Sequence, residues 1–189
     1  MKTSLIAILL AVVFVACDSP QDKEETTDKN YFEITFGIDQ EKNEEATLTF
    51  EIALDSGYYF LSPHTEGLGQ RLLFSVLDTD NLLLDGELEE YPKPREEFDE
   101  LTGKQGKFVR KNTTYNQNLI VNSSDDFEVS GLIWLEILPV YQPYQVSFVI
   151  SHKSGELEIE EISTSVTGYP TFWDKKRIDI PIDKSKKSN

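Results

Sequence analysis

The sequence predicts an all-β protein built as an antiparallel β-sandwich, and three features of the chain support this class. Apolar and polar residues alternate over short stretches rich in aromatic and β-branched residues, which is typical of half-buried strands. Turn-forming residues such as Asp55-Ser56-Gly57 separate these stretches. No stretch of a dozen residues has the apolar periodicity of a helix. Many short strands at regular spacing favour a sandwich.

The strands are expected in a definite order along the chain. Most of them alternate, but residues 72–77 and 132–138 are more continuously apolar, as expected for strands covered on both faces. Residues 96–101 are expected to form at most one helical turn. The expected strands are 32–38, 46–54, 72–77, 127–129, 132–138 and 145–150.

The same pattern predicts where the domain begins and ends. We expect the sandwich to occupy residues 31–154, a size that suits one ordinary domain. Residues 155–189 are then a C-terminal extension with one further strand, indicated by Leu157, Ile159 and Ile162, and a basic tail from Lys184 to the end.

The N-terminal segment resembles a bacterial lipoprotein signal. A positive start at Met1-Lys2 precedes an uncharged, mostly apolar run, residues 4–15, and the small residue Ala16 precedes Cys17, the only cysteine of the chain. The run is shorter than the roughly 20 residues of a transmembrane helix. A plain secreted protein with a stray cysteine remains an alternative.

This resemblance implies that residues 1–16 are a signal peptide and that Cys17 is lipidated. Residues 17–30, which are polar and lack periodicity, are expected to be a flexible tether. The protein is then expected in the cell envelope, anchored by lipid to a membrane such as the outer membrane, facing the periplasm or the cell surface.

The charge of the chain narrows the classes of partner. With 18 basic and 34 acidic residues the net charge is −16, and removal of residues 1–16 takes away only one charged residue, Lys2. Such an acidic chain repels phosphate backbones, so we expect no nucleic-acid partner. Once Cys17 is acylated no cysteine remains for a disulfide, so stability has to come from a buried core.

Four blocks follow one another along the chain: Gly57-Tyr58-Tyr59-Phe60-Leu61-Ser62, Leu72-Leu73-Phe74, the Pro92-Lys93-Pro94 segment, and residues 127–134, which end in Trp134. Taken in this order, they resemble the N-terminal domain of the thiol:disulfide interchange protein DsbD and the related disulfide-bond corrector domains. The resemblance implies an immunoglobulin-like antiparallel β-sandwich.

The chain departs from this family where the family carries its chemistry. Redox-active members have a cysteine pair after the last of these strands, whereas residues 135–144 keep prolines but contain no cysteine. Thiol–disulfide exchange requires a thiolate. We therefore expect a scaffold without the family reaction, and no enzyme.

Aromatic residues near predicted turns are the best candidates for binding. Tyr141, Gln142 and Tyr144, together with Trp134, occupy the place where the resembling family meets its partner, and we expect them to bind an envelope protein. The alternatives are a surface glycan stacked on Tyr58, Tyr59 and Trp173, or a redox-silent accessory role in envelope thiol exchange. An interior position at the ends of the sandwich is the competing interpretation for most of these rings.

No cofactor or metal is expected. The two histidines, His64 and His152, have no thiol or further histidine to complete a zinc site. The acidic residues between Asp78 and Asp85 lack the spacing of an EF-hand loop and are better explained as a solvated turn, although the sequence alone does not settle calcium binding.

Overall fold

The computed structural model describes residues 31–40, 45–68, 71–77, 80–100 and 103–168. Every regular element within them is a strand, which confirms the all-β prediction, and the strands form antiparallel sheets consistent with a sandwich. The signal segment, Cys17, the tether and Trp173 lie outside the described residues.

The first sheet has the strand order β1-β2-β8-β5, and all its pairs are antiparallel. Alternation decides which side chains are buried, as β2 shows: Leu48, Phe50 and Ile52 are fully buried, and the residues between them are not. The strands are β1 (Phe32–Gln40), β2 (Glu45–Leu54), β8 (Thr113–Val121) and β5 (Leu82–Tyr91).

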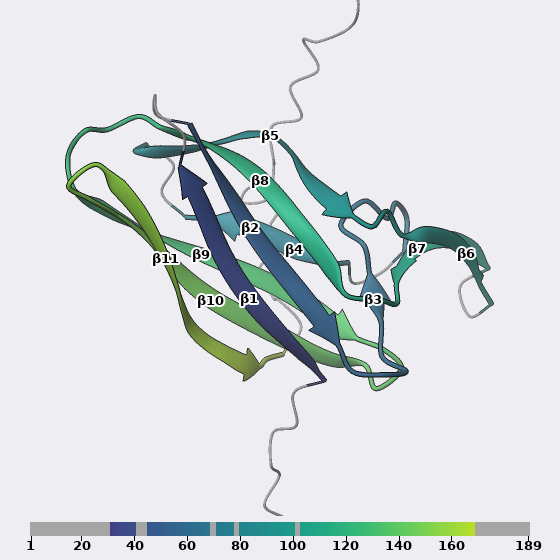
Figure 1. Cartoon of the computed structure of the whole chain (residues 1–189). Helices are drawn as coiled ribbons and strands as arrows, with labels where there is room; N and C mark the ends of the chain where they lie inside the picture. Colours follow the sequence, from purple (N-terminus) through teal and green to yellow (C-terminus); the bar gives the residue numbers. More distant parts are fainter. Residues whose placement is uncertain (1–30, 41–44, 69–70, 78–79, 101–102, 169–189) are drawn as a thin grey trace, which may run out of the picture.

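The second sheet has the order β11-β10-β9-β4 (Figure 1). Its centre, β9, is buried on both faces from Ile133 to Ile137, as the apolar run predicted. The matching prediction for residues 72–77 is wrong, because β4 buries only alternate residues and Leu77 is 54% exposed. The strands are β11 (Glu156–Val166), β10 (Gln142–Lys153), β9 (Phe127–Ile137) and β4 (Leu73–Val76).

Four stacked aromatic rings join the two sheets. Tyr115 stacks on Phe50 at 4.8 Å between ring centroids within the first sheet, and Phe50 stacks on Phe74 of the second sheet at 5.6 Å. Phe74 stacks in turn on Phe148 at 5.9 Å. These stacked rings lie at the centre of one continuous hydrophobic core.

The sandwich extends beyond the predicted boundary at residue 154. Residue 154 lies in the turn between β10 and β11, and β11 pairs with β10 from Glu156 to Val166, so the predicted further strand is part of the second sheet. The side chain of Gln40, at the end of β1, accepts a hydrogen bond from Leu157 N at 2.9 Å and donates one to Gly155 O at 3.1 Å. These bonds link the two sheets at the side where β1 lies beside β11.

A third, smaller sheet has the order β3-β7-β6 and projects beyond one end of the sandwich (Figure 1). It is formed by β3 (Phe60–Leu61), β7 (Lys104–Val109) and β6 (Arg95–Asp99). The expected helical turn at residues 96–101 is therefore wrong: pairing with β7 holds residues 95–99 as a strand.

The sandwich has two ends that differ in composition. At the first, which we call the Tyr31 end, β1 begins, β11 ends and the third sheet is attached; Asp55 N bonds to Tyr31 O there at 3.0 Å. At the other, the Asp125 end, β1 ends, β5 and β9 begin, and the turn at Ser154-Gly155 joins β10 to β11.

Candidate functional site

The turn between β9 and β10 is fixed at the Tyr31 end by two backbone hydrogen bonds. Tyr59 N donates to Leu138 O at 3.0 Å, and Leu138 N donates to Tyr59 O at 2.8 Å. This bridge holds the residues that follow, Pro139 to Tyr141, beside the start of β3.

Tyr141 has a backbone conformation that is unusual for its residue type. Its φ is +54°, in the left-handed region, which crowds the Cβ of any residue larger than glycine. Its side chain is nevertheless 54% exposed and so gains little from burial, and the adjacent Val140 is 43% exposed. Large exposed side chains therefore occupy a turn in which glycine or asparagine would destabilise the fold less.

The structure corrects part of the predicted binding set. Trp134 and Tyr144 are both 1% exposed, so their side chains are inside the protein and present no binding surface. Trp134 lies in the doubly covered part of β9, and Tyr144 packs edge-on against Phe32 at 5.2 Å. Gln142 is half-buried at the start of β10. Of the predicted partner-binding residues, only Tyr141 is well exposed.

The rings proposed for glycan stacking already contact other side chains. Tyr58 packs against Tyr31 with 4.4 Å between centroids. The Arg110 guanidinium lies 3.9 Å from the centroid of Tyr59 and so covers one face of that ring. Trp173, the third ring of this set, lies outside the described residues.

Arg110 connects this region to β6. Its Nε and Nη2 donate to the Glu97 carboxylate at 3.0 Å and 2.8 Å, and this hydrogen bonding is the main reason that the pKa of Arg110 is raised above its usual value. The pair orients the third sheet relative to Tyr59.

Exposed apolar side chains are concentrated at the Tyr31 end. Of the eight large hydrophobic residues that are exposed among the described residues, five lie at this end, and two of these, Tyr91 (75%) and Phe98 (60%), belong to β5 and β6. Neither was among the predicted binding residues: Phe98 lies in a segment expected to form at most one helical turn, and Tyr91 is the last residue of β5. The five are Tyr91, Phe98, Val140, Tyr141 and Val166, while Leu77, Leu83 and Ile162 lie elsewhere.

A buried polar network supports this end from inside. The Glu90 carboxyl group, 7% exposed, accepts hydrogen bonds from Tyr115 OH at 2.6 Å and from Ser62 Oγ at 2.7 Å. Burial, and then the charge of Glu90, raise the pKa of Tyr115 well above its usual 10.0. All three side chains are buried, so the network ties the segment after β3 to β5 and β8 without presenting a reactive group to solvent.

The histidines lie apart from each other. His64 is at the Tyr31 end, where it lines a shallow polar depression of about 170 Å³ together with Glu66, Glu96 and Lys107. His152 is buried at the Asp125 end, with its Nδ1 2.9 Å from Asp125 O. The described residues contain no group of three or more His, Cys, Asp or Glu arranged to hold a metal ion.

No protein-family model matches the chain, and comparison with curated proteins finds no match. Within the described part of the chain, no helix is long and apolar enough to cross a membrane.

Proposed function

We propose that this protein is a non-catalytic, lipid-anchored envelope protein whose β-sandwich binds a protein partner at the Tyr31 end. The contact region is the Tyr141 surface, which we define as Val140, Tyr141 and the accessible part of Gln142. The observation that carries the proposal is Tyr141 itself, an exposed aromatic side chain at a left-handed turn position.

A tyrosine at position 141 destabilises the turn by more than its partial burial contributes to folding. A left-handed conformation costs a residue with a Cβ roughly 1–2 kcal/mol. A half-exposed ring recovers only part of that by burial, so folding alone favours a smaller residue here. Strained backbone and exposed aromatic side chains recur at binding sites, where tyrosine supplies a large and rigid contact.

The anchor is proposed from the signal segment. Lipid on Cys17 would hold the sandwich to a membrane through residues 18–30, which span at most about 45 Å when fully extended. Because β1 begins at the Tyr31 end, this tether joins the sandwich at the same end as the Tyr141 surface.

We further propose that the sandwich is immunoglobulin-like and related to the DsbD N-terminal domain. In support, the order β1-β2-β8-β5 corresponds to strands A-B-E-D of an immunoglobulin constant-type domain, and β4-β9-β10 corresponds to C-F-G. On this assignment β11 is an added strand and β3, β6 and β7 are insertions. Without the family's cysteine pair such a scaffold has no route to thiol–disulfide exchange.

The partner proposal is tested by crosslinking in cells, with the tagged full-length protein recovered from solubilised membranes and its partners identified by mass spectrometry. The test variant is Tyr141→Gly, which removes the ring and keeps the turn, so stability is expected to stay the same or rise by about 1 kcal/mol. The control is Leu77→Ala, since Leu77 is equally exposed but lies near the Asp125 end.

We expect a discrete protein partner that is lost with Tyr141→Gly and kept with Leu77→Ala. Equal recovery of that partner with both variants would contradict the proposal, and so would the absence of any protein partner combined with binding of the protein to a glycan array.

The anchor has its own test. Cys17→Ser is expected to release the protein from membranes or to stall its processing. A processed Cys17→Ser protein that stays in the membrane fraction would refute the anchor.

A further inference from the structure

One face of the third sheet carries polar side chains around the shallow depression. β6 and β7 pair in register, with Glu96 opposite Lys107 and Phe98 opposite Gln105. Because alternate residues of a strand point to the same face, these four side chains share one face of the sheet. All of them except Phe98 line the depression of about 170 Å³.

The other wall of the depression is formed by the segment that follows β3. His64 and Glu66 line it, and buried hydroxyl groups fix its backbone. Thr65, 2% exposed, donates through Oγ to Lys107 O at 3.0 Å and accepts from Lys107 N at 3.2 Å. Ser62 Oγ accepts a hydrogen bond from His64 N at 3.1 Å. The wall is therefore held in position without a ligand.

The buried Glu90 network contributes to this position. Ser62 connects the network to the wall, since its Oγ also donates to the Glu90 carboxyl group at 2.7 Å. Replacing both partners of a buried hydrogen bond with apolar groups can leave stability unchanged, whereas a satisfied polar network makes the segments that it joins more rigid. The network is thus explained better by the fixed wall of the depression than by stability alone.

The side chains around the depression have hydrogen-bonding groups available for a ligand. Four of them make no hydrogen bond or ion pair with another described residue: Glu66, Glu96, Gln105 and Lys107. They present acceptors on two carboxylates and donors on an amide and an ammonium group. Because charges of both signs lie together, the depression favours neither a polyanion nor a polycation.

Phe98 adds an apolar platform to the same face. Its ring is 60% exposed, and the residue lies opposite Gln105 and two positions from Glu96 along β6. A sugar ring matches such a surface, since its C–H groups stack on an aromatic ring and each of its hydroxyl groups both donates and accepts. The volume is below the roughly 300–1,000 Å³ of a site for a drug-sized ligand, so it suits one ring of a longer chain.

From these observations we infer that a neutral glycan binds to this face of the third sheet, with one sugar ring stacked on Phe98. The carboxylates accept from its hydroxyl groups, and the amide and ammonium groups donate to them. We call this surface the Phe98 face, and it consists of Glu66, Glu96, Phe98, Gln105 and Lys107. The site goes beyond the proposed function, because it includes no residue of the Tyr141 surface and does not require the lipid anchor.

The test uses the acyl-free chain, residues 18–189, which contains every described residue. The protein is applied to an array of neutral glycans built from hexoses, pentoses and N-acetylhexosamines, and its affinity for the bound glycans is then measured by titration. Phe98→Ala removes the platform, and Glu96→Ala removes one set of acceptors on the same strand.

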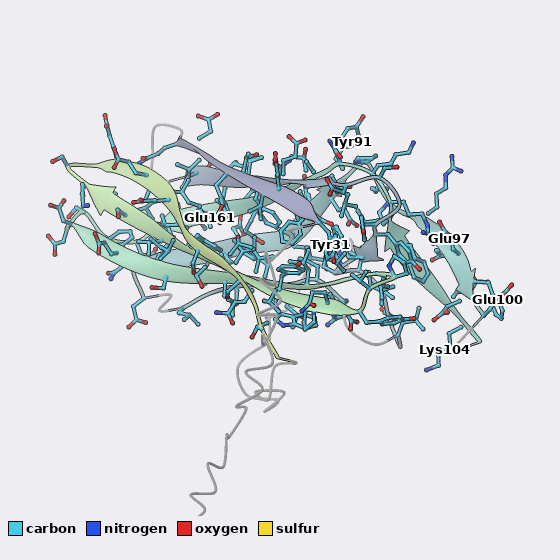
Figure 2. All side chains as sticks on the ribbon, turned by 90° about the horizontal axis from the view of Figure 1, so that it is seen from below. Tyr31, Tyr91, Glu97, Glu100, Lys104 and Glu161 are labelled. Carbon is cyan, nitrogen blue, oxygen red and sulfur yellow. The ribbon has the colours of Figure 1, made fainter. Side chains whose placement is uncertain are left out.

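The matched control is Tyr91→Ala. Tyr91, the last residue of β5, is also an exposed aromatic residue (75%). It lies apart from the hairpin of β6 and β7, on which Glu97, Glu100 and Lys104 are labelled (Figure 2). The side chains replaced in all three variants are exposed, so we expect thermal unfolding to stay close to that of the unchanged protein.

We expect binding to at least one neutral glycan, an affinity weaker by roughly tenfold or more for both Phe98→Ala and Glu96→Ala, and no change for Tyr91→Ala. Binding to none of the neutral glycans would overturn the inference, and this is the result if the face instead binds a peptide. Equal affinity of the Phe98→Ala protein would overturn it as well. The partner test depends on position 141 and the anchor test on Cys17, so a failure here is distinguishable from a failure of the proposed function.

Discussion

The two turns that flank β10 perform the same structural task with different residues. At the Asp125 end the chain reverses through Ser154-Gly155, small residues that both adopt positive φ. At the Tyr31 end it reverses through Leu138 to Tyr141, and a tyrosine adopts the left-handed conformation. Since either turn can join two strands, the bulky one is explained better by what it presents to solvent than by folding.

The difference extends to the whole of each end. The Tyr31 end has an added sheet and most of the exposed large apolar side chains among the described residues, whereas the Asp125 end has no added sheet there. Selection for stability alone gives no reason for this asymmetry, because both ends are closed by the same two sheets. This asymmetry is the reason for proposing the Tyr31 end as the interacting one.

The largest effect is expected from a substitution in the hydrophobic core, on which both ends of the sandwich depend. A Cβ on Gly131 in β9 would collide with the ring of Phe148, one of the stacked rings that join the sheets. Gly131→Ala is expected to lower the free energy of unfolding by about 3 kcal/mol. Gly37→Ala is the control, since a Cβ there meets no atom within 4 Å, and should change it by less than about 1 kcal/mol. Urea denaturation measures both; an unaffected Gly131→Ala protein would show that the core is not packed as described.

The next largest effect is expected from the loss of a buried carboxyl group at the Tyr31 end, compared with the loss of an exposed carboxyl group at the Asp125 end. Glu90→Ala removes the acceptor of two buried hydroxyl groups, so we expect a loss of about 2 kcal/mol in the free energy of unfolding. Glu128→Ala removes an exposed carboxylate and should cost less than about 0.5 kcal/mol. Similar losses for both would mean that the Glu90 network does not support the Tyr31 end.

Alkaline pH acts on the same network through Tyr115. Because the pKa of Tyr115 is raised in the folded protein, folding favours the neutral phenol. The contribution of this preference to the free energy of unfolding is present in full below about pH 10. As pH rises from there toward the folded pKa, unfolding should become easier by about 1.4 kcal/mol per pH unit. Tyr115→Phe should lose this contribution to the pH dependence of urea midpoints between pH 9 and 11. An unchanged profile in that variant would contradict the assignment.

The smallest effect compares one ion pair at each end. Arg110 binds Glu97 with two donors and also covers Tyr59, whereas Lys153 reaches Glu128 at 3.3 Å with both side chains more than half exposed. We expect Arg110→Ala to lower the free energy of unfolding by about 1 kcal/mol and Lys153→Ala to lower it by about 0.2 kcal/mol. Thermal unfolding at two salt concentrations distinguishes them, and equal costs would remove this difference between the ends.

The sequence predicts a strand correctly where local burial determines it, and fails where pairing with a distant strand determines it. Alternation in residues 46–54 and the apolar run at 132–138 predicted strands correctly because burial in the sandwich follows those patterns directly. The strand at residues 95–99 was missed because its charged residues carry no alternation and its pairing with β7 is what makes it a strand.

The candidate site was predicted only in part for a similar reason. Tyr141 and Tyr144 are three residues apart, and nothing local distinguishes a turn residue from one whose ring packs against Phe32 of another sheet. Trp134 is different, because the continuous apolar run around it already indicated burial on both faces. The exposure of Phe98 depends on its place in the third sheet, which local sequence did not reveal.

The most direct test of the account is a photocrosslinking amino acid placed at position 141, and separately at position 77, in the full-length protein in cells. We predict a crosslink from position 141 to a discrete protein partner and no such crosslink from position 77. A partner captured from position 77 but not from position 141 would contradict the assignment of the Tyr31 end as the interacting one.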